Sequence, residues 1–453
     1  MIDTKTHANT HAKTHANTDA LSHAVAPVFE QLEARRLLAV VAARPADDFV
    51  DSIGINIKIA GPNSGQNDTI YANFPEIKRL LDDLNIRHIR DGYLQRDTVK
   101  AARLNELAND LGIKATLLMR PDEAGESDFV QELTDVKPAL FAIEGPNEPD
   151  LAPISPNFNF EGQGFPTGAV LWQEALYAQS KAHPDPQIAA LPVLAPSFGL
   201  TSEGVVGVTA DAQNIHAYSG QGKPRNSFAK LEAYHDVTGG NSEKPIIVTE
   251  TGYSDGEVVP GQTRPPGLTT GAPEPIEPTE EVVAKYLPRT LLDYWNRGTQ
   301  RVFLHQLMDL WSINAETPTP PNQPPNQIAR LNGSGRESNF GLVDVDGPGS
   351  GANVSEKPSF YAVKNLIDLL DGAGTGVDPD SLDLTFTGNT ADLRYTLLQH
   401  KDTNAGEPVF FLGVWIDKPS WDDVNDVVIN NPTQSVTINF GGNVDDIGVF
   451  DIV

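Results

Sequence analysis

The sequence predicts an α/β protein: a (β/α)8 barrel, the TIM-barrel architecture, followed by a small C-terminal antiparallel β-sandwich domain. Three observations predict this. Between residues 47 and 372, eight short apolar runs typical of strands alternate with amphipathic stretches typical of helices. No glycine-rich phosphate turn follows the first run, which disfavours an open doubly wound sheet. After Gly372 the helical stretches stop, and strand-like runs follow one another between Gly, Asn, Asp and Pro turns.

The first 46 residues are expected to lie outside the fold as a disordered or targeting segment. The opening repeat "THANTHAKTHANT" has no apolar periodicity and cannot bury enough surface to order itself. Further on, "FEQLEARRLLAV", residues 29–40, resembles the Leu-Glu-x-Arg-x-Leu-Leu motif near the N-termini of many exported bacterial proteins, with Ala34 where the usual form has Pro. We therefore expect a secreted, cell-surface or periplasmic protein.

The barrel is expected to occupy residues 47–372. In its first unit, the strand "DSIGINIKI" precedes the helix "NFPEIKRLLDDL", whose leucines and Ile77 recur at helical spacing behind Asn73, a candidate cap. The other strands are predicted at 86–92, 114–120, 140–149, 191–197, 214–219, 244–254 and 301–311. The other helices are predicted at 96–112, 127–136, 167–182, 226–236, 279–298 and 359–370.

The sandwich is expected to occupy residues 373–453, with strands at 382–388, 391–401, 408–416, 435–440 and 446–453. Because the chain ends on an apolar run, we expect this domain to borrow a strand from the segment before the barrel or to be cut short. Two long Pro-rich segments, 256–278 and 313–336, follow the last two barrel strands, where loops of a barrel overhang its active-site face.

The composition excludes several classes of function. The net charge of −28 repels phosphate backbones, so nucleic acid is not an expected partner. No run of ~18 apolar residues is present, which excludes a membrane span. The absence of cysteine excludes disulfides and thiolate chemistry. His216 and His305 both fall on predicted strands, but without His-x-His or His-Glu-x-x-His we expect neither a catalytic metal nor a cofactor.

The chemistry is expected where barrel strands end, because their C-terminal ends meet at one mouth. "LFAIEGPNEPD", residues 140–150, places Glu148 after the fourth strand, and "VTETG" places Glu250 at the end of the seventh. Two carboxylates so delivered fit the acid and the nucleophile of a retaining glycosidase, which stand ~5 to 5.5 Å apart. Desolvation and a second carboxylate would keep Glu148 protonated, whereas Glu250 needs donors or cations such as Arg90 and Tyr218 to stay ionised.

Asn147-Glu148-Pro149, His216-x-Tyr218 and Thr249-Glu250-x-Gly252 together resemble clan A of the retaining glycoside hydrolases, over residues 50–372. A barrel with an appended sandwich is similar to members in families 30, 39 and 79. The resemblance implies that Glu148 is the acid/base, that Glu250 is the nucleophile, and that Asn147 donates to the sugar 2-hydroxyl. It also implies that His216 and Tyr218 belong to the site, Tyr218 holding Glu250. Many members end strand eight with a Trp platform; here Trp311 lies just beyond and is the candidate stacking residue.

Simpler interpretations remain for single residues. Arg90 could pair with Asp91, His216 could be a satisfied core histidine, and Phe158, Phe160 and Phe165 could anchor a loop rather than line a sugar cleft. Together the motifs favour a retaining β-glycoside hydrolase that takes a poly- or oligosaccharide, most consistent with endo-action on a polysaccharide. An exo-acting β-glycosidase and a non-catalytic glycan-binding surface protein are the alternatives. The oligomeric state has no signature in the sequence.

Overall fold

The structure is a computed structural model that describes residues 38–60, 69–93, 97–119, 129–151, 158–200, 205, 207–229, 244–255, 277–310, 339–347, 349–372, 378–401, 408–425, 427–442 and 447–451. Several expectations lie outside these ranges: the N-terminal segment up to residue 37, most of the helix at 226–236, Trp311, and nearly all of the two Pro-rich segments. No helix in the described ranges is long and apolar enough to cross a bilayer.

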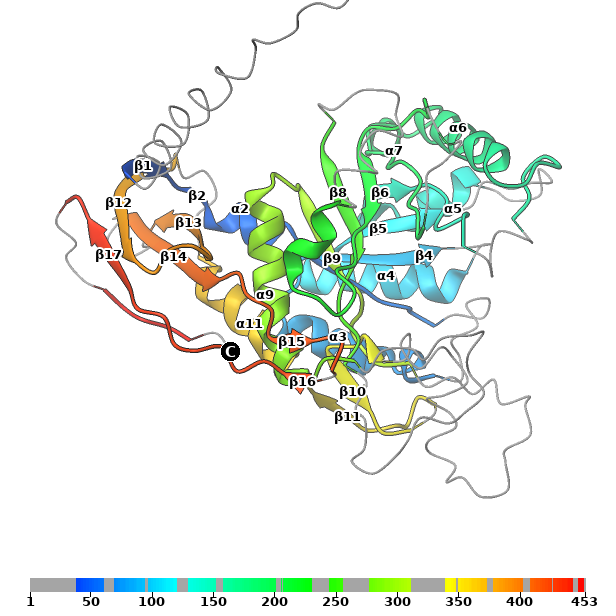
Figure 1. Cartoon of the computed structure of the whole chain (residues 1–453). Helices are drawn as coiled ribbons and strands as arrows, with labels where there is room; N and C mark the ends of the chain where they lie inside the picture. Colours follow the sequence, from blue (N-terminus) through cyan, green and yellow to red (C-terminus); the bar gives the residue numbers. More distant parts are fainter. Residues whose placement is uncertain are drawn as a thin grey trace, which may run out of the picture.

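A curled sheet of seven parallel strands forms the wall of the barrel (Figure 1). In chain order they are β3 (Ile53–Asn56), β4 (His88–Tyr93), β5 (Lys114–Met119), β6 (Leu140–Glu144), β7 (Gln213–His216), β8 (Ile246–Thr251) and β9 (Arg301–Leu304). The order within the sheet is β6-β5-β4-β3-β9-β8-β7, so the first strand pairs with the last, as a barrel requires. Each strand coincides with one predicted from an apolar run.

The fifth predicted strand, 191–197, closes the gap between β6 and β7 without forming a regular strand. Val193 and Ser197 make parallel bridges to Ile143 and Asn147, and Leu194 bridges to Ala212. Because Pro192 and Pro196 lack the N–H that a ladder needs, pairing is reduced to isolated bridges. The seven strands and this extra segment together surround the barrel axis, and the predicted fold class is confirmed.

The helices cover the outside of the barrel: α3 (Phe74–Asp83), α4 (Thr98–Leu111), α5 (Phe129–Asp135), α6 (Thr167–Lys181), α9 (Glu280–Asn296) and α11 (Pro358–Leu370). Shorter pieces are α2 (Ala46–Asp51), α7 (Pro186–Ala189), η1 (Ile70–Ala72), η2 (Lys137–Ala139) and η3 (Pro224–Ser227). Helix α4 begins where the Asp97 side chain accepts from the Lys100 N–H, and it ends at Gly112, whose φ of 71° favours glycine. Asn73 precedes α3 as expected, but its side chain makes no capping bond.

Two three-stranded sheets form the C-terminal sandwich. One has the order β1-β12-β17 and the other β14-β13-β2. The strands are β1 (Leu38–Ala42), β2 (Arg44–Pro45), β12 (Ser381–Gly388), β13 (Leu393–Lys401), β14 (Pro408–Ile416) and β17 (Val436–Phe440). Between them lies a small core that includes Leu384, Phe386 and Leu397. The pairs are antiparallel except that of β2 with β13.

Two expectations about the sandwich need correction and one holds. The domain does borrow strands from the N-terminal lead, since β1 and β2 belong to it. Residues 38–46 are therefore part of the fold, contrary to the expected boundary. The expected last strand is wrong for residues 447–451, which form no strand and leave Val449 and Phe450 exposed. Both edges of β12 are already taken, by β1 and β17, so that strand offers no free edge.

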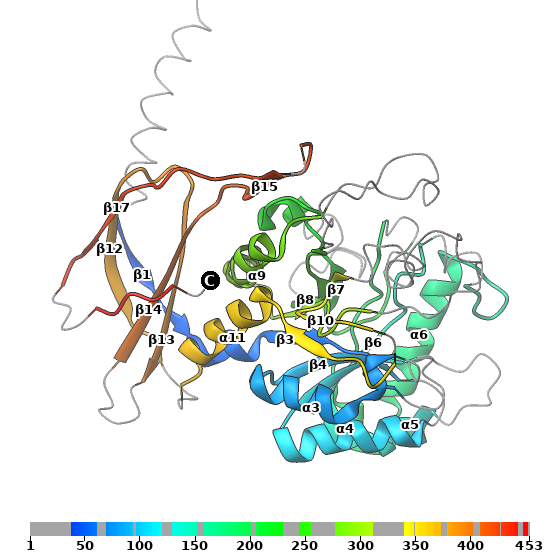
Figure 2. The same ribbon diagram turned by 90° about the horizontal axis from the view of Figure 1, so that it is seen from below.

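The sandwich lies against α9 and α11, on the outer face of the barrel (Figure 2). The Arg44 guanidinium stacks on the Trp295 ring at 3.5 Å, and the Tyr286 hydroxyl accepts from the Ser420 N–H at 2.7 Å. Lys223, in the loop after β7, donates from Nζ to Asp417 Oδ2 at 3.1 Å. Two small ladders, β10 (Val343–Val345) with β11 (Val354–Glu356) and β15 (Trp421–Asp422) with β16 (Val427–Val428), complete the described elements.

Candidate active site

The C-terminal ends of the strands bring a polar cluster to the mouth of the barrel. Asn56 ends β3, Arg90 lies on β4, Glu144 ends β6, His216 ends β7, Glu250 lies on β8, and His305 directly follows β9. Asn147 and Glu148 follow β6, and Tyr218 follows β7. Every predicted site residue except Trp311, which lies outside the described ranges, is in this cluster.

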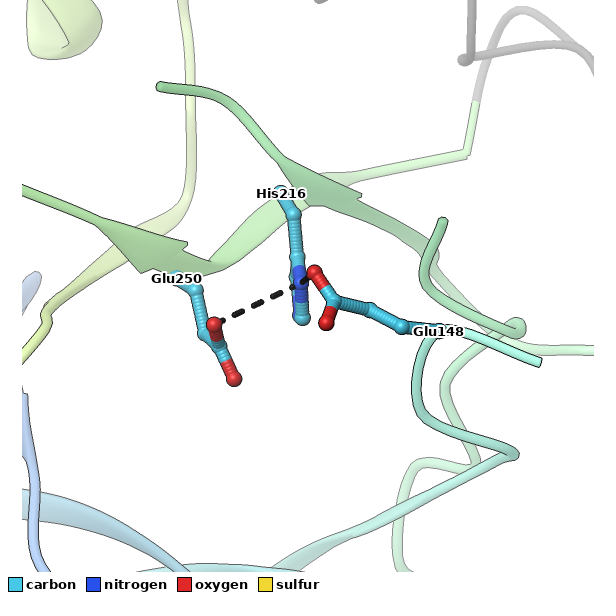
Figure 3. A group of neighbouring side chains, drawn as sticks. All are labelled: Glu148, His216 and Glu250. Atoms are coloured by element: carbon cyan, nitrogen blue, oxygen red, sulfur yellow. Dashed lines mark hydrogen bonds and ion pairs between the residues drawn. The ribbon is translucent and has the colours of Figure 1, made fainter. Parts of the chain in front are cut away.

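Glu148, His216 and Glu250 form the centre of the cluster (Figure 3). One oxygen of each carboxylate and one ring nitrogen lie within 4.8 Å of one another. His216 Nδ1 is 2.7 Å from Glu148 Oε1 and 3.5 Å from Glu250 Oε2. Two carboxyl groups whose nearest oxygens lie this close are compatible with the ~5 to 5.5 Å spacing of retaining glycosidases. Glu148 has a φ of 46°, a left-handed conformation that a non-glycine residue adopts at a cost of ~1–3 kcal/mol and that clusters at functional sites.

The surroundings of Glu250 hold it ionised. Arg90 Nη1 lies 2.5 Å from Oε1, and the Tyr218 hydroxyl donates to Oε2 at 2.9 Å. Burial works to raise the pKa of Glu250, but the positive charge of Arg90, the neighbouring imidazoles and the Tyr218 hydrogen bond together place that pKa well below its usual range. An ionised carboxylate facing the mouth is what a nucleophile needs.

Arg90 is shared between two carboxylates, one of which the sequence did not reveal. Its Nε and Nη2 atoms lie 2.5 and 2.7 Å from the two oxygens of Glu144, which is fully buried. The alternative pairing with Asp91 does not occur, because Asp91 pairs with Lys100 at 2.8 Å. Arg90 Nη2 also donates to Asn147 Oδ1 at 2.6 Å, which leaves the Asn147 amide N–H groups as donors toward the mouth.

A chain of hydrogen bonds places one proton on Nε2 of His216. Asn214 Nδ2 donates to Glu144 at 3.0 Å, so its Oδ1 accepts from the Thr249 hydroxyl at 2.5 Å. Having given its proton away, Thr249 Oγ1 accepts from His216 Nε2 at 3.1 Å. The short contact between His216 Nδ1 and Glu148 therefore contains one proton, held by the carboxyl or by the ring. One short hydrogen bond thus links Glu148 to His216.

His305 is a site residue that the sequence analysis did not assign. Its Nδ1 lies 3.2 Å from Asn56 Nδ2 and 3.8 Å from Glu250 Oε2. Burial, with Lys58 and Arg90 adding to it and Glu250 opposing, lowers the pKa of His305 to about 4. The ring is therefore neutral near neutral pH.

A second buried charge cluster lies where the chain leaves β8 and β9. Lys357 Nζ, just before α11, is 2.6 Å from Asp255 Oδ1 and 2.9 Å from Asp309 Oδ2. Asp309 also accepts from the Gly341 N–H at 2.7 Å, and the Asp255 N–H donates to the Asn339 carbonyl at 3.0 Å. Burial raises the pKa of Asp255 to about 8 and that of Asp309 to about 6. Lys357 thus pairs with two carboxyl groups and links the chain segments that follow β8 and β9 to α11.

The phenylalanines after β6 are loop anchors rather than cleft walls. Phe158 and Phe160 are buried and stack on Trp172 of α6 at ring distances of 5.2 and 6.1 Å. Phe165 packs edge-on against Phe198 at 6.4 Å. Aromatic rings packed on one another in this way fix the path of the chain.

Among the described residues, Glu148, His216 and Glu250 also form a set that could hold a metal ion. Carboxylate oxygens and an imidazole nitrogen suit Zn²⁺, and Thr249 would orient the ring from behind through Nε2. The positive charge of Arg90 on Glu250 works against a cation there.

No protein-family model and no curated protein matches the sequence. Solved structures do match: a Bacteroides fragilis protein described as a β-galactosidase (13% identity, TM-score 0.45, 84% of this chain and 53% of that one) and a β-glucuronidase from Faecalibacterium prausnitzii (13%, 0.43, 75% and 50%). A family 10 endoxylanase retrieved from a sugarcane soil metagenome matches at 14% identity and a TM-score of 0.41, over 73% of this chain and 100% of that one. The chain spans about half the length of the first two. At these values the likenesses assign no role to any residue, and the argument for function rests on the site.

Proposed function

We propose that the protein is a retaining β-glycoside hydrolase that cleaves poly- or oligosaccharides by double displacement. The observation that carries the proposal is the pair of carboxylates within 4.8 Å in contrasting surroundings. Glu250 is paired with a cation and a hydroxyl, while Glu148 is hydrogen-bonded to His216. A carboxylate held ionised by Arg90 and Tyr218, beside a second carboxyl that bonds a histidine, is the arrangement that nucleophile and acid require.

In the first step an oxygen of Glu250 attacks the anomeric carbon, the glycosidic bond breaks, and the leaving oxygen takes the proton from Glu148. This gives a glycosyl ester on Glu250 and a carboxylate at position 148. In the second step Glu148 removes a proton from water, the water oxygen attacks the anomeric carbon, and Glu250 is released with net retention. Asn147, held by Arg90 through its oxygen, presents its N–H groups to the sugar 2-hydroxyl.

The first experiment compares the wild type with Glu148→Gln and Glu250→Gln in reducing-sugar release from β-glucans, xylans, mannans, galactans and marine polysaccharides. Activity on one polymer that both changes abolish supports the proposal and identifies the substrate. The controls are 2,4-dinitrophenyl β-glycosides, whose leaving group needs no acid, with azide as an added nucleophile. Glu148→Gln should keep the glycosylation step on these substrates and yield a β-glycosyl azide, whereas Glu250→Gln should be inert. Activity that survives Glu250→Gln overturns the assignment of the nucleophile.

We also propose endo-action on an exported enzyme, supported by the long segments that follow β8 and β9 and by the motif at residues 29–40. The product-length distribution from the active polymer tests the first point: a ladder of oligosaccharides is expected, and release of single sugars from one chain end would establish the exo alternative. Fractionation of cells that carry the gene tests the second.

The metal-binding geometry of Glu148, His216 and Glu250 favours one rival, a metal-dependent hydrolase. Dialysis against EDTA separates the two. A glycosidase of the proposed kind keeps its full rate after chelation, whereas loss of activity that Zn²⁺ restores would replace the double-displacement proposal.

A further inference from the structure

His305 shares the mouth of the barrel with the two carboxylates. Its side chain is 9% exposed, against 12% for Glu250 and 17% for Glu148. It directly follows β9, and its Nδ1 atom lies 3.8 Å from Glu250 Oε2. A group bonded to Glu250 therefore comes within contact distance of this ring.

Three neighbours fix the orientation of the ring. The side-chain amide of Asn56, from the adjacent strand β3, donates to Nδ1 at 3.2 Å, and the main-chain carbonyl of Asn56 accepts from the Leu307 N–H at 3.0 Å, which fixes the backbone there. Tyr218 and Phe340 pack edge-on against the ring, with centroids at 6.3 and 5.4 Å. The Asn56 contact takes up Nδ1, so the nitrogen left free on the imidazole is Nε2.

The Nε2 atom of His305 is a donor without an acceptor. No described residue bonds it, and it is not sealed from solvent. Because the Asn56 amide nitrogen can only donate, Nδ1 is the acceptor of this bond and the ring proton resides on Nε2. The site thus presents a polar N–H, where an aromatic platform would offer only an apolar face.

We propose that His305 determines substrate specificity: its Nε2–H donates a hydrogen bond to a hydroxyl of the sugar unit held against Glu250. This inference rests on the proposed glycosidase function. β9 stands four strands from β6 in the barrel order, so His305 faces Asn147 across the mouth. Since Asn147 is proposed to bind the 2-hydroxyl, the hydroxyl that His305 binds lies on the opposite side of the sugar ring, at C4 or C6. A site built to bond a hydroxyl strongly rejects an analogue that lacks it.

The test is a cycle of enzyme and substrate changes. The probes are the 2,4-dinitrophenyl β-glycoside of the sugar whose 2-deoxy-2-fluoro analogue labels Glu250, and its 4-deoxy and 6-deoxy derivatives. His305→Phe keeps the ring and its edge contacts but removes both nitrogens, and it should lower kcat/KM on the parent glycoside by about 10- to 100-fold. With the wild type, kcat/KM should fall by a similar factor when one of the two deoxy substrates replaces the parent glycoside. With His305→Phe, the same replacement should cause no further fall in kcat/KM. The matched control His400→Phe, in the sandwich, should change none of these values. If, for both deoxy substrates, the loss of kcat/KM caused by His305→Phe and the loss caused by removing the hydroxyl simply add, the proposal is overturned.

A second measurement does not depend on turnover. In protein with ¹⁵N-labelled histidine, the signal missing from His305→Phe should be that of a neutral ring protonated at Nε2, and it should shift when the 2-fluoro sugar is trapped on Glu250. A signal that stays unchanged on trapping, or a ring protonated at Nδ1, contradicts the proposal while leaving the glycosidase assignment intact. If no 2-fluoro sugar labels Glu250, the glycosidase function fails and the role of His305 fails with it.

Discussion

Tyr218→Phe tests how the proposed nucleophile, Glu250, is kept ionised. The change removes one hydrogen bond, from the Tyr218 hydroxyl to Glu250 Oε2 at 2.9 Å, and keeps the ring that packs on Phe340. A hydrogen bond to a charged group is worth about 1.5–3 kcal/mol. At about 1.4 kcal/mol per pKa unit, its loss should raise the pKa of Glu250 by roughly one to two units. Arg90 remains in place, so the carboxylate stays ionised near neutral pH.

The assay is the pH dependence of kcat/KM on a 2,4-dinitrophenyl glycoside, whose phenolate departs without help from Glu148, from about pH 2 to pH 8, because the pKa of Glu250 in the wild type lies well below its usual range. Activity is lost as the pH falls through the pKa of the nucleophile. The acid limb should therefore move upward by roughly one to two pH units in Tyr218→Phe. Tyr395→Phe, in the sandwich, is the control and should leave the limb in place. A lower plateau with an unmoved acid limb would refute the reasoning, because Tyr218 would then act on geometry and not on charge.

Two further predictions concern the buried cluster beyond β8 and β9. Lys357→Met leaves two buried carboxyls without their cation and should lower the free energy of unfolding by about 3–5 kcal/mol, as measured by urea denaturation; a loss below about 1 kcal/mol would mean that the pairs contribute nothing. Burial raises the pKa of Asp255 to about 8 and that of Asp309 to about 6 in the folded protein, above the value near 3.9 of an unfolded carboxyl. Groups with raised folded pKa values add stability that is complete at low pH and is lost as the pH rises through those values. The thermal midpoint should therefore fall between about pH 4, where the unfolded carboxyls ionise, and about pH 8, where folded Asp255 ionises, and Asp255→Asn should flatten that fall; an unchanged slope in the variant would contradict the assignment.

Most of the fold was predictable because strands of a parallel barrel are buried on both faces and read as apolar runs. The exceptions have local causes. Pro192 and Pro196 lack backbone N–H donors, so the fifth predicted strand, an apolar run, forms isolated bridges instead of a regular strand. The strands β1 and β2 were hidden because Leu38–Ala42 overlaps the basic, export-like stretch, and their partners in β12 and β13 lie more than three hundred residues away. Pairing over such a separation leaves no periodic trace in the sequence.

The site divides in the same way. Glu148 and Glu250 were recognisable because each stands at the end of an apolar run in a distinctive local motif. Glu144 could not be recognised, although it lies four residues before Glu148. A single acid in an apolar run indicates no role until its partner is known, and that partner, Arg90, lies 54 residues earlier. Asn56 and His305, separated by 249 residues, meet only because the first and last strands pair when the barrel closes.

Glu144 explains how Arg90 can lie beside the proposed nucleophile, Glu250, without disabling it. A bidentate pair with Arg90 is the strong form of this contact, and Glu144 holds it through Nε and Nη2. Only the single Nη1 contact is left for Glu250. In Glu144→Gln, which preserves size, the full guanidinium charge would fall on Glu250, lowering the pKa of that carboxyl further and making it a weaker nucleophile. The acid limb of kcat/KM should then move down in pH while kcat falls, opposite in direction to the limb shift of Tyr218→Phe. If both variants moved the limb the same way, Arg90 would not be dividing its charge between the two carboxylates.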